Sequence, residues 1–137
     1  MIVLAGRNLA KMEAAKAELD KLGVESCLCK TDIADRAQVQ ALAEFAASLG
    51  DVTQVIHTSG VSPSDTATEN IIKINAVGTV NMVEAFYPAL TDGGVMINFS
   101  SVAAYAMSKK FVIHFTQKNV ALRGKALPHP VRSEERR

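Results

Sequence analysis

The chain has 137 residues, of which 48% are hydrophobic and 21% charged, and its formal net charge is +1. Its length limits it to one domain, and its composition is that of an ordinary globular protein. The near-zero charge argues against nucleic acid or a membrane surface as a partner. No apolar run approaches the roughly 20 residues that span a bilayer, and no signal-peptide pattern opens the chain, so we expect a cytoplasmic protein.

The first third of the sequence predicts two strands around a helix. Residues 2–5 form a short apolar run, as in a buried parallel strand. Asn8 can cap the helix that follows, and Gly23 can end it. Residues 24–30 then have the composition of a second strand.

The pattern then repeats. A helix begins at Asp32 or Asp35, carries an apolar side that includes Phe45 and Leu49, and ends at Gly50. Residues 52–57 predict the third strand, which leads into a polar loop.

The last elements are longer. We expect a helix over about residues 69–89, a turn at residues 92–94, a fourth strand over residues 95–99 and a final helix over about residues 105–122. The alternation predicts an α/β fold: a partial doubly wound parallel sheet, Rossmann-like, with about four strands and helices on both faces. Residues 1–123 would form this domain, and residues 124–137 a basic, mobile tail.

Cys27 and Cys29 lie two apart in the second strand, so both side chains point to one face of it. Such a pair does not suit a disulfide, and no second cysteine pair or nearby histidine completes a metal site. We therefore expect free thiols in a reducing compartment and no bound metal.

Three polar residues near the fourth strand carry potential chemistry. Tyr105 and Lys109 are four apart on the predicted last helix and share one face of it. There the ammonium can favour the phenolate, and the phenol can exchange a proton with an alcohol or carbonyl. With Ser101 just after the strand, this arrangement resembles the active site of the short-chain dehydrogenase/reductase family.

Further motifs extend the resemblance over about residues 2–123. His57-Thr58-Ser59-Gly60 stands where the family usually has Asn-Asn-Ala-Gly, and residues 73–79 resemble its helical asparagine motif around Asn75. Gly60 would let the backbone approach the cofactor or take a positive φ. Asn75, on an apolar helix side, needs hydrogen-bond partners, and the family uses it in a proton relay. His57 is interpreted as structural or cofactor-adjacent, not as a base.

The resemblance implies a nicotinamide cofactor and an alcohol/carbonyl substrate. Ser101 would polarise the substrate oxygen, Tyr105 would be the general acid or base, and Lys109 would hold the nicotinamide ribose and lower the pKa of the tyrosine. Thr58, Ser59 and Gly60 would contact the cofactor. Family members are commonly homo-oligomers.

Two strand ends bear on cofactor choice. Arg7 follows the first strand and can bind a 2′-phosphate, which favours NADP(H) over NAD(H). In the family, an Asp-Ile pair such as Asp32-Ile33 approaches the adenine ring; Asp32 could equally be a helix N-cap.

The sequence departs from the family pattern in three places. No glycine-rich turn that would admit a pyrophosphate is present, and the chain begins where the family's second strand would, so the central first strand is missing. The strands at residues 2–5 and 52–57 would then pair directly or leave two open edges. Only three residues separate Ser101 from Tyr105, a span of at most about 14 Å, and no strand follows the last helix.

These departures describe a truncated member of the family, for which the missing glycine turn weakens the case for cofactor binding, and we expect no turnover by the isolated chain. Two alternatives remain open at this point. One is the extended branch of the superfamily, which includes nucleotide-sugar epimerases and dehydratases. The other is a non-catalytic remnant or binding module.

Overall fold

A computed structural model describes residues 1–62 and 66–101 of the chain. The chain divides into two units, Met1–Phe99 and Ser100–Arg137. The first unit contains all the elements described below. The predicted last helix and basic tail lie outside the described residues, as does the predicted domain boundary at residue 123.

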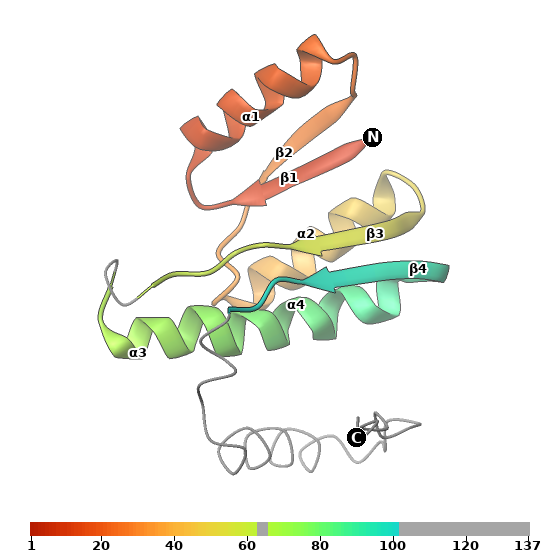
Figure 1. Ribbon diagram of the computed structural model, residues 1–137. Helices are drawn as coiled ribbons and strands as arrows, with labels where there is room; N and C mark the ends of the chain where they lie inside the picture. The colour runs from red at the N-terminus through yellow and green to blue at the C-terminus, as the bar shows by residue number, and fades with distance from the viewer. Residues whose placement is uncertain (63–65, 102–137) are drawn as a thin grey trace, which may run out of the picture. The chain divides into compact units, whose positions relative to one another are not determined.

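Strands and helices alternate in the first unit, as Figure 1 shows. The first half holds β1 (Ile2–Gly6), α1 (Leu9–Lys21), β2 (Ser26–Lys30), α2 (Arg36–Ser48) and β3 (Val52–His57). The second half is one helical run followed by a strand: α3 (Thr68–Ile71), a π-helix (Ile72–Gly78), α4 (Thr79–Phe86), a 3-10 turn (Tyr87–Ala89) and β4 (Leu90–Asn98).

Local sequence signals set the ends of the first two helices. The Asn8 side chain accepts a hydrogen bond of 3.0 Å from the backbone N–H of Lys11, which satisfies a free donor at the start of α1. Gly23 follows the end of α1 with φ +70°, a conformation that glycine adopts without steric cost. Asp35, and not Asp32, caps α2, because its side chain accepts from the backbone of Ala37.

The sheet consists of two parallel pairs that do not join. β1 pairs with β2 and β3 pairs with β4, each as a separate two-stranded sheet. The fold is therefore α/β with parallel strands, as the sequence predicts. Of the two arrangements expected for β1 and β3, the structure has the second: each strand keeps one open edge, and Figure 1 shows both running in the same direction.

The fourth strand is longer than predicted. Residues 92–94, expected to form a turn before the strand, lie inside β4. The register shifts between Val52 and Gln54, where the partners on β4 jump from Leu90 to Val95. Gly93 has φ +78°, so the extra residues form a glycine-containing irregularity within the strand. The glycines do change the backbone direction, but β4 pairs with β3 on both sides of them.

The helical run from Thr68 to Ala89 agrees closely with the predicted helix, but its hydrogen bonding is not uniform. Residues 72–78 form a π-helix, a rare geometry that is frequent at functional sites. It includes Asn75, the asparagine singled out from the sequence.

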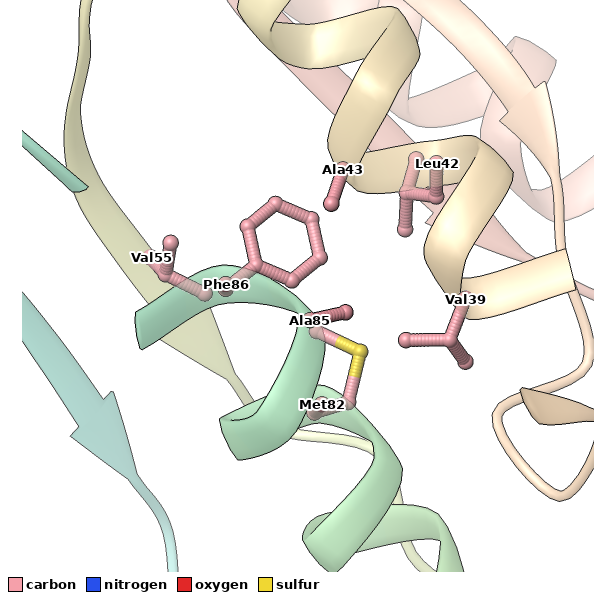
Figure 2. Close-up of a cluster of buried hydrophobic side chains, with 7 residues drawn as sticks. All are labelled: Val39, Leu42, Ala43, Val55, Met82, Ala85 and Phe86. Atoms are coloured by element: carbon pink, nitrogen blue, oxygen red, sulfur yellow. The ribbon is translucent and has the colours of Figure 1, made fainter. Parts of the chain in front are cut away.

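The core lies between α2, β3 and α4. Seven buried side chains form it: Val39, Leu42, Ala43, Val55, Met82, Ala85 and Phe86. Figure 2 shows the Phe86 ring of α4 between Val55 of β3 and Ala43 of α2. An ion pair of 2.7 Å between Arg36 and Glu84 also links α2 to α4.

Several apolar side chains predicted to lie inside are exposed. Phe45 of α2 is 37% exposed and Leu49, directly after that helix, is 40% exposed, and on α1 only Met12 is buried. The main contacts of α1 are with β1 and β2, so most of its surface remains exposed. Within the described residues, no helix combines the length and apolar character that a membrane span requires.

Candidate functional site

A cleft of about 760 Å³ runs along the full length of β1 and β3, from Met1 and Asp51 at their amino ends to the carboxyl ends, where the residues after β2 also line it. Its floor carries apolar side chains of α2 and α4, including Leu42, Ala46 and Phe86. The strand-end residues that line it are Gly6, Thr31, Ile33, His57, Thr58 and Ser59. In open parallel sheets, ligands bind in the crevice at this end of the strands.

Thr31 joins the ends of β1 and β2. Its side chain is 2% exposed, its N–H donates to the carbonyl of Gly6 at 3.0 Å, and its hydroxyl donates to the carbonyl of Cys29 at 3.3 Å. Thr31 was not among the predicted site residues. A threonine directly after a strand and before Asp32 was the available signal.

The loop around Ile33 is held from the helical run of the second half. The buried Asn81 side chain donates to the Ile33 carbonyl at 2.9 Å. Gly78 packs so closely that a Cβ there would lie 2.7 Å from Ile33 Cδ1 and 2.8 Å from Cγ1. Neither contact was foreseen; the available signal was Asn81, an asparagine among apolar residues of the predicted helix.

Asp32 and Asp35 both stabilise the start of α2. Asp32 accepts at Oδ1 from the N–H of Ala34 at 2.9 Å, and its own N–H donates to the Gln38 side chain. Asp35 accepts from the backbone N–H groups of Gln38 and Ala37. The hydrogen bonds from Gln38, backbone first and then side chain, lower the pKa of the Asp35 carboxyl below its usual 3.8. Asp32 is thus used in a turn and does not line the cleft.

His57 is a buried residue with a defined partner. It is 4% exposed, and its Nε2 lies 3.3 Å from the Thr79 hydroxyl. That hydroxyl donates to the Asn75 carbonyl at 2.7 Å, so it is free to accept from an Nε2–H. Burial lowers the pKa of His57 below its ordinary 6.5, which keeps the ring neutral at pH 7.

Asn75 is committed to the loop after β3. Its side-chain amide donates to the Val61 carbonyl at 2.8 Å and accepts from the Val61 N–H at 2.9 Å. It has the partners that the sequence analysis required, although the residue is exposed and not buried in an apolar face. A Cβ at Gly60 would meet Asn75 Oδ1 at 3.5 Å, an ordinary contact, and Gly60 is not among the glycines with positive φ.

The structure thus brings together only some of the predicted site residues. Ile33, Thr58 and Ser59 line the cleft, whereas Arg7 and Gly60 do not. Arg7 is exposed after β1. Ser101 is exposed and belongs to the second unit, and Tyr105 and Lys109 lie outside the described residues. Cys27 and Cys29 are free and half-buried, and residues 1–62 and 66–101 contain no cluster able to hold a metal ion.

Parallel strands alternating with helices, with strand ends opening on a cleft, define a Rossmann-like α/β protein. The chain matches the short chain dehydrogenase family over residues 1–127 and belongs to that family. It is 27% identical over 108 residues to the short-chain dehydrogenase/reductase bsc3 of Alternaria brassicicola. It is 33% identical over 134 residues to the erythronolide synthase EryA3 of Saccharopolyspora erythraea, covering 85% of this chain and 4% of that protein.

Solved structures of short-chain dehydrogenase/reductases have a similar fold. A short-chain dehydrogenase/reductase of Burkholderia phymatum in complex with NAD matches with a TM-score of 0.68 and 25% identity, over 85% of this chain and 49% of that one. One from Brucella melitensis matches in fold with the same TM-score and 16% identity, over 90% of this chain and 59% of that one. The match to the Alternaria protein spans 79% of this chain but only 39% of the length of that protein.

The described residues fit one part of a nicotinamide dinucleotide better than the other. The strand ends at Gly6, Ile33 and Thr58 offer an uncharged crevice suited to an adenosine. A pyrophosphate needs free N–H groups at a helix start. Among the helices of the described residues, Asn8 already caps one N–H group of α1, and α2 begins at the Asp35 carboxylate, which would repel an anion. The start of α3 has no side-chain cap, but it does not line the cleft. The fit is therefore to the adenosine end.

Proposed function

We propose that this chain forms the adenosine end of the cofactor site in an NADP(H)-dependent oxidoreductase of the short-chain type. The supporting observation is that the carboxyl ends of β1, β2 and β3 open on one cleft. The cofactor supplies hydride transfer to or from an alcohol/carbonyl pair. Cofactor binding, substrate orientation and proton transfer depend on the residues of the chain.

The preference for NADP(H) rests on Arg7. An exposed guanidinium at the end of β1 can form paired hydrogen bonds to a 2′-phosphate. Asp32 and Ile33 follow β2, and their loop is fixed by Asn81 and Gly78. Because the loop is held in place before binding, Ile33 would contact an adenine without a rearrangement of the loop.

In the proposed reaction Ser101 polarises the substrate oxygen, Tyr105 gives or takes the proton and Lys109 favours the tyrosinate. We assign Asn75 a positioning role. Because both ends of its amide bond Val61, it fixes the loop that carries Thr58 and Ser59. We further propose a reducing, cytoplasmic location, which the free thiols Cys27 and Cys29 support.

The experiment is a calorimetric titration with 2′,5′-ADP and, separately, with 5′-AMP. We expect the 2′-phosphate to strengthen binding, and Arg7→Ala to weaken 2′,5′-ADP about tenfold, the loss of one charge-assisted contact. Lys11→Ala is the matched control, since Lys11 is also an exposed cation near the start of α1. AMP binding should be the same in all three proteins. Equal affinity for both ligands would refute the role of Arg7, and failure of both to bind would refute the adenosine site.

A further inference from the structure

His57 joins three segments at the carboxyl end of β3. Its main-chain carbonyl accepts from the N–H of Phe99 at 3.0 Å, which ties β3 to the residue directly after β4. Its buried ring lies with Nε2 3.3 Å from the hydroxyl of Thr79, the first residue of α4. Thr58 and Ser59, which line the cleft, follow it directly in the chain. The ring therefore connects the strand that carries this loop to the helical run.

The Thr79 hydroxyl replaces a main-chain group of the helical run. In an α-helix the N–H of Thr79 would donate to the carbonyl of Asn75, four residues earlier. At the end of the π-helix this N–H donates to the carbonyl of Ala76. The Thr79 hydroxyl donates to the Asn75 carbonyl at 2.7 Å in its place. Because a hydroxyl has one hydrogen, the Thr79 oxygen can only accept from His57, and a neutral ring must carry its proton at Nε2.

Asn75 transmits this constraint to the loop after β3. Its side-chain amide donates to the Val61 carbonyl at 2.8 Å and accepts from the Val61 N–H at 2.9 Å. The backbone of Asn75 is the one that the Thr79 hydroxyl holds. The chain from residue 57 to 61 and the hydrogen bonds through Thr79 and Asn75 thus form a closed ring. Residues 58–60 are held from both of their ends.

We propose that His57 is a positioning residue of the cofactor site: through Thr79 and Asn75, its Nε2–H fixes the loop of residues 58–61. The effect on the loop stands by itself, and its consequence for the cofactor rests on the proposed function. A loop that is ordered before binding loses less conformational entropy when a ligand binds. The link should therefore strengthen the binding of an adenosine ligand. A ring that only filled space beneath α4 would do neither.

The test is amide hydrogen exchange followed by NMR, with Val61 as the reporter of the loop and Val39 as the reporter of the core. Val39 is fully buried, and its N–H donates to the Asp35 carbonyl at 3.1 Å. We expect His57→Asn and Thr79→Val each to speed exchange at Val61 about tenfold relative to the core reporter. A loss of global stability alone would speed exchange at Val39 at least as much as at Val61, so the ratio separates positioning from stability.

Two matched variants keep the donor or the acceptor. Glutamine places its amide nitrogen as many bonds from Cβ as Nε2 of histidine, whereas the asparagine nitrogen is one bond nearer to Cβ. His57→Gln and Thr79→Ser should therefore keep the exchange ratio of the unmodified chain. In His57→Asn combined with Thr79→Val, the ratio should not exceed that of either single variant, because both break the same link.

Thr91→Val is the control for the loss of a threonine hydroxyl. The Thr91 hydroxyl donates to the Val52 carbonyl at 3.4 Å, at the amino end of β3. Its removal should leave exchange at Val61 unchanged. Nitrogen NMR of the His57 ring should show the proton at Nε2 and a bare Nδ1. Circular dichroism confirms that each variant is folded, and the Thr79 pair tests the link without any change at His57.

Titration with 5′-AMP extends the test to the cofactor site. We expect about fivefold weaker binding by His57→Asn and Thr79→Val, and unchanged binding by His57→Gln and Thr79→Ser. Unchanged Val61 exchange in Thr79→Val, equal exchange in His57→Gln and His57→Asn, or a ring protonated at Nδ1 would overturn the proposal. So would altered exchange with the same 5′-AMP affinity in every variant. If the unmodified chain binds no 5′-AMP, the proposed function fails, and the exchange data still decide whether His57 positions the loop.

Discussion

The close approach of Gly78 to Ile33 gives a prediction whose size follows from two opposing terms. A Cβ added at Gly78 would lie 2.7 Å from Ile33 Cδ1 and 3.4 Å from its Cβ, so more than the tip of the side chain must move. Overpacking of this kind costs about 1–3 kcal/mol. Alanine in place of a helical glycine returns about 1 kcal/mol. Gly78→Ala should therefore lower the free energy of unfolding by about 1 kcal/mol.

Removing the obstacle should reverse the sign. In an Ile33→Ala background the two closest atoms are gone, and Gly78→Ala should raise the free energy of unfolding by up to about 1 kcal/mol. Urea unfolding of the four proteins gives the coupling, expected to be about 2 kcal/mol. Gly60→Ala is the control, because its added Cβ meets Asn75 only at 3.5 Å. Equal effects of Gly78→Ala in both backgrounds would refute the packing argument.

Three further predictions concern polar groups near the strand ends. Burial holds the pKa of His57 below 6.5, so the unfolded chain binds the proton more readily than the folded chain. The free energy of unfolding should therefore fall as the pH drops below about 6.5. Urea melts of His57→Asn should lack this dependence of the free energy of unfolding on pH. Asn81→Ala leaves the Ile33 carbonyl without its 2.9 Å bond and should cost about 1–3 kcal/mol; a loss below the error of the urea melt would contradict it. Asn75→Ala removes both bonds to Val61, and because the site is exposed it should cost about 1 kcal/mol and speed amide exchange of Val61; unchanged exchange would count against the positioning role.

The order of elements could be predicted because each has a local cause. Asn8 starts α1 through its side-chain hydrogen bond, and Gly23 ends it through its positive φ. The third strand was predicted with the bounds that it has, Val52–His57. Residues 92–94 were placed wrongly because a glycine turn and a glycine irregularity within a strand have the same local sequence. Pairing of Leu90 with Val52 across the sheet distinguishes them, and the sequence of one strand does not contain that contact.

Part of the candidate site was predictable in position, but its contacts were not. The sequence pointed to Ile33, Thr58 and Ser59, which do line the cleft. It missed Thr31 and Asn81, whose roles come from backbone carbonyls of distant segments. The Asn81 partner is fixed only when the helical run packs against α2 and the loop that follows β2. The sequence left open whether β1 and β3 pair, and the structure keeps them in separate sheets.

The most direct test of the account is to map 2′,5′-ADP onto the chain by amide NMR. The account predicts that titration shifts the amide signals at three strand ends: Gly6 and Arg7, Thr31 to Ile33, and Thr58 to Gly60. The signals of α1 beyond its first turn should stay in place, because that helix does not line the cleft. Saturable shifts confined to these three segments would support a cofactor site at the strand ends. Shifts confined to other segments, or none at millimolar ligand, would contradict it.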